Sequence, residues 1–309
     1  MSSAFELIIV GGGPAGAAAA VYAARKRLKT LLIVDEWGGQ SGISLDVQNW
    51  IGTPSISRAD LADALKKHTE SYAGDYLTIA ARERATGLVV HEDTVEVTTS
   101  KGTYSAQALL IATGASRRKL DVPGAKEFDQ KGLTYCASCD GPLFADKDAV
   151  IIGGGNAGFE TALQLLEYCK SVTLLNRSNV FKADEISVES ALANPKMRVI
   201  KNAVPTKVTG EQFVTGLTLK HTDTGKEEEL TVEGVFVEIG LIPNTQWLGN
   251  AVKMNEIRQV KIDARTQRAS HARIWAAGDC TDGPYHQNNI AAGDAVKALE
   301  DIYMFLRRN

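Results

Sequence analysis

The stretch Leu7-Ile8-Ile9-Val10-Gly11-Gly12-Gly13-Pro14-Ala15-Gly16 decides the fold of this chain. Apolar residues 5–10 predict a buried strand before the glycine turn, and the alanine-rich run after it predicts a helix to about Arg27. In such a turn Gly11 makes the tight bend, Gly13 lets the backbone approach a pyrophosphate, and Gly16 lets the helix pack closely on the strand. The first N–H groups of the helix would then face the phosphates.

A second apolar run predicts a strand from Thr30 to Val34, and Asp35 follows it. Asp35 lies about 20 residues beyond the glycine turn, where a dinucleotide-binding fold places a carboxylate that accepts a hydrogen bond from a ribose 2′-OH. A lone glycine turn could equally be a tight turn in an α/β core. Strand, turn, helix, strand and acid in this order instead indicate a dinucleotide site.

The same unit occurs a second time. Val150-Ile151-Ile152-Gly153-Gly154-Gly155-Asn156-Ala157-Gly158 predicts a strand and a glycine turn, a helix follows, and a further strand is predicted from Val172 to Leu175. Asn176 and Arg177 stand where the first unit has its acid. Absence of the acid removes repulsion against a 2′-phosphate and the arginine can pair with it, which favours NADP over NAD. The alternative for Arg177 is an ordinary loop cation.

Cys136 and Cys139 lie between the two glycine turns, and Asp140 follows directly. A C-x-x-C pair can close a small, easily reduced disulfide. Zinc would need two further ligands at suitable spacing, but Cys169 and Cys280 stand alone and no histidine pair supports them. The pair therefore indicates redox chemistry, with two buried structural cysteines as the alternative, and no metal site is predicted.

Length and composition limit the other possibilities. At 309 residues, two domains are expected. The net charge of -3, from 34 basic and 37 acidic residues, argues against nucleic acid as the main ligand, because phosphate binding needs a basic surface. No apolar run is long enough to span a bilayer, and no secretory signal precedes the first strand. A cytoplasmic protein without a membrane partner is therefore expected.

With both glycine turns, the cysteine pair between them and a late Gly278-Asp279, the sequence resembles the low-molecular-weight thioredoxin reductase family over essentially its whole length. Within that family it is similar to the flavoprotein subunit of alkyl hydroperoxide reductase, through residues 139–144 and 240–245. That subunit carries an additional N-terminal thioredoxin-like module, which these residues do not contain. Electrons are therefore expected to pass to a separate protein.

The resemblance implies an α/β fold with two Rossmann-like dinucleotide-binding domains of the three-layer ββα type, one inserted in the other. The FAD-binding domain would comprise residues 1–117 and 246–309, and the nicotinamide-nucleotide domain, with the cysteine pair, residues 118–245. Crossings near 115–118 and 245–248 are expected to act as hinges. We interpret Arg117-Arg118-Lys119 at the first crossing as a solvated surface cluster, with a hinge or docking of an acidic partner as alternatives. A homodimer is expected from the resemblance alone.

The resemblance also assigns the cofactor residues. For FAD they are Gly11, Gly13, Pro14, Ala15, Gly16, Asp35, Glu36, Gly39, Gln40, Asn49, Ala112, Thr113, Gly114, Gly278, Asp279, Gln287 and Asn288. For the nicotinamide nucleotide they are Gly153, Gly155, Asn156, Ala157, Gly158, Asn176, Arg177, Lys182 and Gly240. Arg177 and Lys182 are two of the three cations usual around the 2′-phosphate, so NADPH is favoured while NADH stays open. His286 stands where the family has an arginine facing the flavin, and it would either tune the flavin or serve packing.

The activity implied is an FAD-dependent disulfide reductase of the thioredoxin reductase type. Electrons would pass from NAD(P)H through FAD to Cys139, and Cys136 would attack the partner disulfide. Asp140 would be the general acid, with a turn-forming Asp-Gly as its alternative. The partner would be a thioredoxin-like or glutaredoxin-like protein, which could in turn feed a peroxiredoxin. The alternatives are a ferredoxin-dependent reductase or an oxygen-using disulfide oxidase with a vestigial nicotinamide site. A non-enzymatic nucleotide sensor would not need the cysteine pair.

Overall fold

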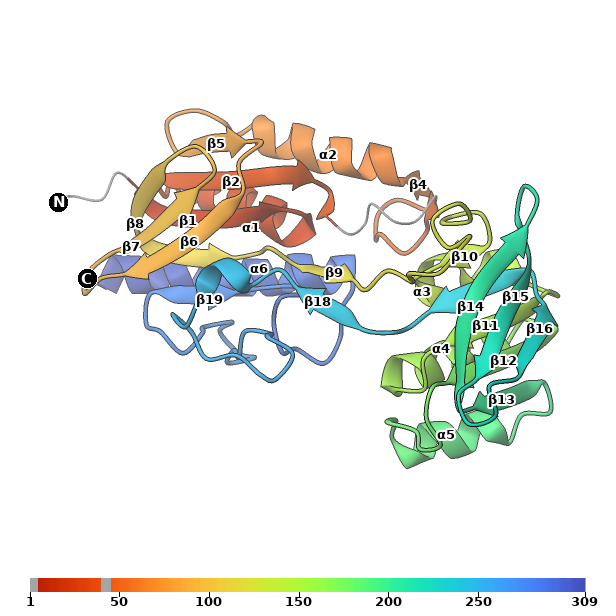
Figure 1. Cartoon of the computed structure of the whole chain (residues 1–309). Helices are drawn as coiled ribbons and strands as arrows, with labels where there is room; N and C mark the ends of the chain where they lie inside the picture. The colour runs from red at the N-terminus through yellow and green to blue at the C-terminus, as the bar shows by residue number, and fades with distance from the viewer. Residues whose placement is uncertain (1–4, 40–45, 309) are drawn as a thin grey trace. The chain divides into compact units, whose positions relative to one another are not determined.

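A computed structural model describes residues 5–39 and 46–308. These residues form two compact units (Figure 1). Unit 1 contains residues 5–39, 49–116 and 242–308, and unit 2 contains residues 117–241 together with residues 46–48. The chain thus returns to unit 1 slightly before the predicted boundary at 245. Gln40, which was predicted for the FAD site, lies outside the described residues.

Unit 1 is built on a seven-stranded sheet in the order β5-β2-β1-β8-β7-β6, with β19 also paired to β8. Strands β1, β2, β5, β8 and β19 are mutually parallel, whereas β6, β7 and the start of β8 are antiparallel. The elements are β1 (Phe5–Gly12), α1 (Pro14–Arg25), β2 (Thr30–Trp37), β4 (Ile56–Ser57), α2 (Arg58–Glu70), β5 (Leu77–Ala81), β6 (Ala85–Val90), β7 (Val95–Thr99), β8 (Thr103–Ile111), η3 (Gln246–Leu248), β19 (Ile274–Ala276) and α6 (Asn288–Arg308).

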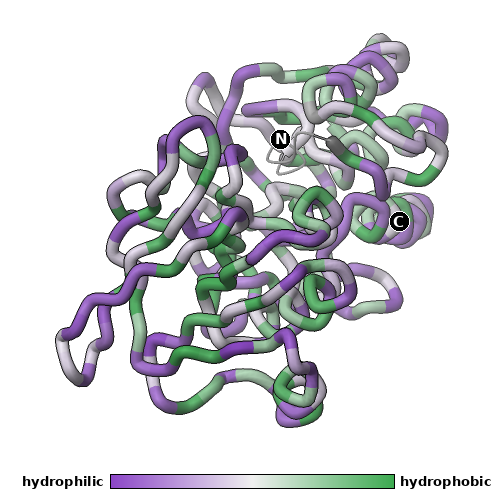
Figure 2. The backbone as a smooth tube through the Cα atoms, turned by 90° about the vertical axis from the view of Figure 1, so that its right-hand side faces the viewer, coloured by the Kyte–Doolittle hydropathy of each residue, from purple (hydrophilic) through white to green (hydrophobic). Residues whose placement is uncertain are grey.

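Successive side chains of the central strands point to opposite faces of the sheet, which creates the layers of unit 1. Leu7 and Ile9 of β1 are buried against α1 and α6, which cover one face of the sheet. Ile8 and Val10 point the other way and pack with β6 and β7. Figure 2 shows hydrophobic stretches along much of the inner backbone and hydrophilic stretches in many of the outlying loops. Two layers of strand and one of helix result.

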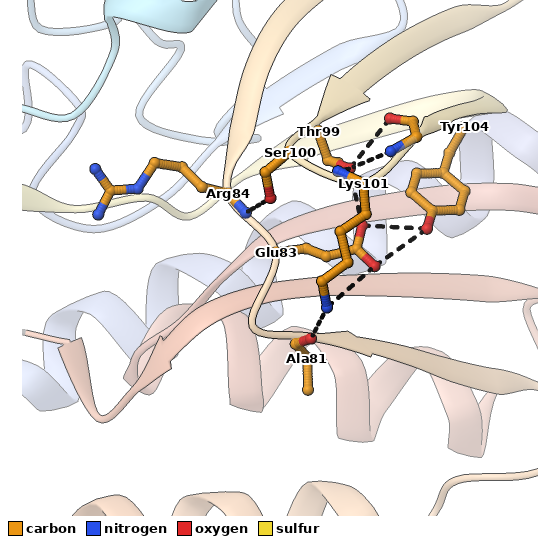
Figure 3. A network of polar contacts seen from close by, with 8 residues as sticks. Ala81, Glu83, Arg84, Thr99, Ser100, Lys101 and Tyr104 are labelled. Atoms are coloured by element: carbon orange, nitrogen blue, oxygen red, sulfur yellow. Dashed lines mark hydrogen bonds and ion pairs between the residues drawn. The ribbon is translucent and has the colours of Figure 1, made fainter.

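A polar network joins the turn between β5 and β6 to the turn between β7 and β8 (Figure 3). The buried carboxylate of Glu83 accepts hydrogen bonds from Thr99 at 2.8 Å and from Tyr104 at 3.1 Å, and Lys101 Nζ lies 4.0 Å away. Burial and then the Glu83 carboxylate raise the pKa of Tyr104. Because a buried carboxylate is costly without partners, the network fixes the turn between β5 and β6. The backbone of Arg84, the next residue, is therefore held in place by this network.

Unit 2 repeats the plan with a parallel sheet in the order β10-β17-β11-β12-β13 and a separate antiparallel sheet in the order β14-β15-β16. Ala149 and Ile151 of β11 pack with α4, while Val150 and Ile152 pack with the antiparallel sheet. The elements are β3 (Asp46–Val47), β10 (Leu133–Thr134), α3 (Ala137–Asp140), η2 (Gly141–Phe144), β11 (Asp148–Ile152), α4 (Asn156–Leu166), β12 (Ser171–Asn176), α5 (Glu185–Leu192), β13 (Met197–Lys201), β14 (Ala203–Gly210), β15 (Val214–His221), β16 (Glu227–Thr231) and β17 (Gly234–Val237).

The two segments that join the units pair with each other. They are β9 (Ala115–Arg117) and β18 (Leu241–Pro243), which form a two-stranded sheet. Asn244, just after β18, exchanges hydrogen bonds with Thr113: its Nδ2 donates to Thr113 O at 2.9 Å, and Thr113 Oγ1 donates to Asn244 O at 2.8 Å. The predicted α/β fold with parallel sheets is confirmed. Among the described helices, none has the length and apolar character needed to cross a membrane.

Candidate functional site

The two glycine turns have the same geometry. Gly11 and Gly153 adopt φ values of 128° and 126°, a region that favours glycine. A Cβ at Gly16 would lie 1.8 Å from Gly11 O, and a Cβ at Gly158 would lie 1.9 Å from Gly153 O. In each unit the helix therefore starts in direct contact with the strand that precedes it.

Both helices that begin at these turns have open N-termini. Gly13 and Gly155 are the N-cap residues of α1 and α4, and neither helix has a side-chain cap from the described residues. The first N–H groups of each helix therefore need another acceptor, and the partial positive charge of a helix N-terminus favours an anion. Space above Gly13 and Gly155 is open, since a Cβ there would meet no described atom closer than 3.7 Å. Each turn fits the pyrophosphate of a dinucleotide.

Several of the residues predicted for FAD meet at the first turn. A Cβ on Gly11 would lie 2.1 Å from Ala112 O, and a Cβ on Gly39 would lie only 3.3 Å from Gly13 Cα. Gly278, with φ 77°, packs against Ala15 of the first helical turn. The ends of β1, β8 and β19 and the loop after β2 thus converge, as expected at the carboxyl ends of parallel strands.

Polar residues from distant parts of the chain complete this end of unit 1. Asn49 Nδ2 donates to Gln287 Oε1 at 3.2 Å, and Asn289 Nδ2 donates to Asn49 O at 2.7 Å. His286 Nδ1 lies 3.5 Å from Asp279 Oδ1. The predicted residues Asn49, Gln287 and Asp279 therefore lie in one polar cluster with residues at the start of α6. His286 is part of it through its contact with Asp279.

Two of the predicted FAD residues have partners that the sequence did not suggest. Asp35 Oδ2 accepts a charge-assisted hydrogen bond from Arg84 Nε at 2.6 Å. A ribose hydroxyl would have to share this half-exposed carboxylate with the guanidinium. Thr113 donates its hydroxyl hydrogen to Asn244, so its side chain serves the crossing between the units.

In unit 2 the loop after β12 folds over the second glycine turn. Lys182 N donates to Gly154 O at 3.0 Å, and Asp184 N donates to Asn156 Oδ1 at 2.9 Å. The side chains of Arg177 and Lys182 are exposed, and neither forms an ion pair with any described residue. Lys182 therefore borders the turn through its backbone, and the binding of a phosphorylated nucleotide by the two exposed cations stays a prediction.

Asn176 is engaged within that loop. It is buried, and its Nδ2 donates to Ser178 O at 2.8 Å and to Val180 O at 3.0 Å. Its Oδ1 lies against Gly154, where a Cβ would be only 2.4 Å away. The side chain that the sequence assigned to the nucleotide thus shapes the loop that carries Arg177. Its direct contact with a nucleotide stays a prediction.

The cysteine pair is oxidised and lies at the start of a short helix. Cys136 and Cys139 form a disulfide, and Cys136 is the N-cap of α3. Asp140 is buried and accepts a short hydrogen bond from Thr134 Oγ1. The same hydroxyl accepts from Cys136 N at 3.3 Å. Thr134 therefore joins the predicted general acid to the predicted attacking cysteine, a role that no spacing in the sequence indicated.

Helix α4 connects the cysteine pair to the glycine turn. Gln164 Nε2 donates to Ala137 O at 3.3 Å, and Ser138 Oγ donates to Gln164 Oε1 at 3.2 Å. A Cβ at Gly141 would lie 3.3 Å from Leu165 of the same helix and 2.2 Å from Oη of Tyr168, which follows that helix. One helix thus begins at the predicted nucleotide site and, near its other end, contacts the two residues between the cysteines.

The other two cysteines are structural. Cys169 and Cys280 are fully buried and form no disulfide, and burial raises the pKa of each thiol to about 11. Both are therefore protonated and unreactive at neutral pH. Within residues 5–39 and 46–308 no group of three or more histidine, cysteine or acidic side chains is arranged to hold a metal ion.

Within Arg117-Arg118-Lys119, Arg118 and Lys119 are exposed and Arg117 is half-buried. Arg117 Nη1 lies 3.6 Å from Glu238 Oε2. Lys119 Nζ lies 2.7 Å from Asp129 Oδ2 and 4.3 Å from the centre of the Tyr135 ring. Two of the three cations therefore have acidic partners within unit 2, while Arg118 and Lys119 are exposed, as expected of a solvated surface cluster.

Comparison with known proteins agrees with this geometry. Residues 5–295 match the model of the pyridine nucleotide-disulphide oxidoreductase family. The chain belongs to this family. The expected oxidoreductase of the thioredoxin reductase type is thereby confirmed at the level of the family, and members of this family are flavin- and nicotinamide-dependent.

Individual members of the pyridine nucleotide-disulphide oxidoreductase family are similar over the whole chain. An NADH dehydrogenase of Bacillus subtilis is 37% identical over 306 residues, and an alkyl hydroperoxide reductase component of Escherichia coli is 38% identical over 307 residues. Each alignment covers 99% of this chain and 59% of the relative. The chain thus spans about three-fifths of the length of the curated relatives it matches.

Solved structures of similar length also match. Thioredoxin reductase from Streptococcus pyogenes aligns with a TM-score of 0.89 at 30% identity and covers 100% of both chains. Thioredoxin reductase from Giardia duodenalis aligns with a TM-score of 0.91 at 30% identity, over 98% of this chain and 99% of the other. These likenesses confirm two Rossmann-like domains.

Proposed function

We propose that the protein is an FAD-dependent reductase that carries electrons from a reduced nicotinamide nucleotide to the disulfide of a separate protein. The observation that carries the proposal is the single helix α4, which begins at an open dinucleotide turn and, near its other end, contacts through Gln164 the two residues between Cys136 and Cys139. Unit 1 has a second turn of the same geometry. Two dinucleotide sites and one disulfide are the parts that such a chain of electron transfer needs.

FAD, when bound, supplies a two-electron carrier between the nicotinamide and the disulfide. In unit 1 the open N-terminus of α1 would bind its pyrophosphate, with Gly13 and Gly39 leaving room for it. Asp279 and Asn49 would contact the polar groups between pyrophosphate and ring. In unit 2 the N-terminus of α4 would bind the pyrophosphate of the nicotinamide nucleotide.

The cysteine pair then exchanges with a partner. Two electrons and two protons convert the Cys136–Cys139 disulfide to two thiols. The Cys136 thiolate attacks a partner disulfide, a mixed disulfide forms, and the first partner sulfur leaves as a thiol. Cys139 next displaces the second partner sulfur and re-forms the original disulfide. Asp140, held by Thr134, would supply the proton that the leaving sulfur needs.

The partner and the electron donor follow from the same site. We propose a thioredoxin-like or glutaredoxin-like partner, because the exchange needs an accessible disulfide on a small protein, and such a carrier could feed a peroxiredoxin. Arg177 and Lys182 favour NADPH, since these two exposed cations lie in the loop that folds over the turn. Action in the cytoplasm as a homodimer is part of the proposal.

Anaerobic stopped-flow absorbance tests this function. The oxidised, FAD-loaded protein is mixed with NADPH and, separately, with NADH, and bleaching of the flavin is followed. Fast bleaching by NADPH is expected and would support the role of Arg177 and Lys182, whereas fast bleaching by NADH alone would contradict the nucleotide preference. Absence of bleaching by both would overturn the proposal in favour of a ferredoxin-dependent reductase or an oxygen-using disulfide oxidase.

A further inference from the structure

A carboxyl group outside the predicted site residues lies beside the second glycine turn. Glu238 follows directly after β17, and its N–H donates to Ile152 O at 2.9 Å. The backbone carbonyl oxygen of Glu238 lies beside Gly153: a Cβ built on Gly153 would be 2.2 Å from it. Strands β11 and β17 are parallel neighbours, so Glu238 stands at the carboxyl edge of the sheet, where a dinucleotide passes.

The Glu238 side chain is held between two elements. Thr161 of α4 donates to Glu238 Oε1 at 3.0 Å, and Arg117 of β9 lies 3.6 Å from Glu238 Oε2. Only 10% of the side chain is exposed. Glu160, which is exposed on α4, is the other charged group that acts on it. Burial is the main influence and raises the pKa of the Glu238 carboxyl to about 7, against the opposing effects of Arg117 and Thr161.

The distance from this carboxyl to the phosphate site is short. Thr161 is five residues beyond Asn156, the first residue of α4, which places it about 7.5 Å along the helix axis. The proposed pyrophosphate would lie at the start of the same helix. Two negative groups at such a separation in a partly buried site repel each other, so a bound anion should favour the protonated carboxyl.

We propose that Glu238 is a proton-linked residue of the nucleotide site, which takes up a proton when an anionic nucleotide binds at the α4 turn. This inference rests on the proposed function. It predicts that nucleotide affinity falls about threefold as the pH rises from 6 to 8, because the ionised carboxylate repels the pyrophosphate. It also predicts uptake of about a quarter of a proton on binding near pH 7.

Isothermal titration calorimetry of the FAD-loaded protein tests the proposal. ADP-ribose is the probe, because it carries the pyrophosphate but neither the redox-active ring nor its charge, and bound FAD blocks unit 1. Titrations at pH 7 in PIPES and imidazole buffers, which differ in ionisation enthalpy and contain no phosphate, give the number of protons taken up. The wild type should show uptake. Glu238→Gln, which keeps an acceptor for Thr161, should show none and should bind with equal affinity at pH 6 and pH 8.

Two further variants separate charge linkage from a structural role. Glu167→Gln makes the same change at the far end of α4 and should retain the proton uptake of the wild type. Arg117→Gln removes the cation that favours the ionised form, so the fall in affinity should move to higher pH. Binding without proton uptake in the wild type, or equal uptake in Glu238→Gln, would overturn this inference alone. Failure to bind ADP-ribose, NADPH and NADH would overturn the proposed function with it.

Discussion

The hydroxyl of Thr134 donates to the carboxylate of Asp140 while it accepts from the backbone N–H of Cys136. One side chain thus orients the group that would supply a proton and the backbone of the group that would attack the partner. Thr134 precedes the cysteine pair on β10, so its position is set by the parallel sheet of unit 2 and not by the short helix α3.

Replacement of Thr134 by valine should slow the disulfide step. The change keeps the shape but leaves Asp140 with one partner fewer, a loss that is worth about 1–3 kcal/mol for a buried charged group. We expect turnover with a protein disulfide to fall about tenfold, while reduction of the flavin by nucleotide keeps its wild-type rate. Thr206→Val is the matched control, because Thr206 donates to Thr218 O within the antiparallel sheet. Equal turnover of the two variants would contradict a role for Thr134.

Thiol labelling should distinguish the two classes of cysteine. After mild reduction, iodoacetamide at pH 8 should modify Cys136 and Cys139 but spare Cys169 and Cys280, because both are buried and their thiols have a raised pKa of about 11. Mass spectrometry of digests gives the pattern, and protein in guanidinium chloride should be labelled at all four. Native labelling of Cys169 would show that its pocket opens.

The same two thiols give a pH dependence of stability. A cysteine whose pKa is raised in the folded state remains protonated there, while the unfolded chain loses the proton from about pH 9. The folded state then binds more protons, so its stability falls as the pH rises from 9 to 11. Cys280→Ala should reduce this fall when urea midpoints are compared across that range, and an unchanged slope would contradict the assignment.

Substitutions at the closest glycines should remove one cofactor at a time. Gly158→Ala places a Cβ 1.9 Å from Gly153 O and should abolish nucleotide binding while bound FAD is retained. Gly16→Ala makes the equivalent change in unit 1 and should cause loss of FAD. Flavin absorbance and nucleotide titration report the two effects.

Gly293→Ala serves as the control for these substitutions. Gly293 lies within α6, and a Cβ there would meet no described atom within 4 Å. This change should leave both cofactors bound and stabilise the helix by about 0.5–1 kcal/mol. If Gly158→Ala bound nucleotide as the control does, the second turn would not be the nucleotide site.

Charge at the second turn should set the nucleotide preference. The double variant Arg177→Ala and Lys182→Ala removes both exposed cations and should raise the KM for NADPH about tenfold or more, because each charged contact to a phosphate contributes about 1 kcal/mol or more. The KM for NADH should change less than twofold. Lys226→Ala, in the exposed turn between β15 and β16, is the control. Equal losses for both nucleotides would show that these cations do not contact a 2′-phosphate.

Local patterns predicted the frame of the molecule. Each glycine turn, together with the strand before it and the helix after it, is a local unit of about 30 residues. The structure shows the two turns with nearly the same φ values at Gly11 and Gly153. Such units can be read from sequence because the turn requires glycine and the strand requires a continuous apolar run.

Contacts between distant residues could not be predicted in this way. Arg84 pairs with Asp35 at the end of the neighbouring strand β2, and Arg117, at the start of unit 2 in the sequence, pairs with Glu238 near its end. Asn176 stands at the expected place for a nucleotide contact, which stays a prediction, and the sequence did not indicate that its amide also holds the loop that follows it. The sequence contained one signal for Glu238. It is a charged residue directly after the apolar run of β17, and charged residues are rare at buried strand ends.

The pairing partners of strand β8 are translated at very different times, so the sheet of unit 1 can be completed only late in synthesis. The first half of β8 pairs with β7, which is already made, but Leu109 and Ile111 pair with β19, whose residues 274–276 are translated only after the whole of unit 2. Unit 2 is nearly continuous in sequence and can therefore fold on the ribosome while the edge of β8 still lacks its neighbour. Premature termination before residue 274 would release a chain with a finished nucleotide unit and an open, aggregation-prone strand edge in the other.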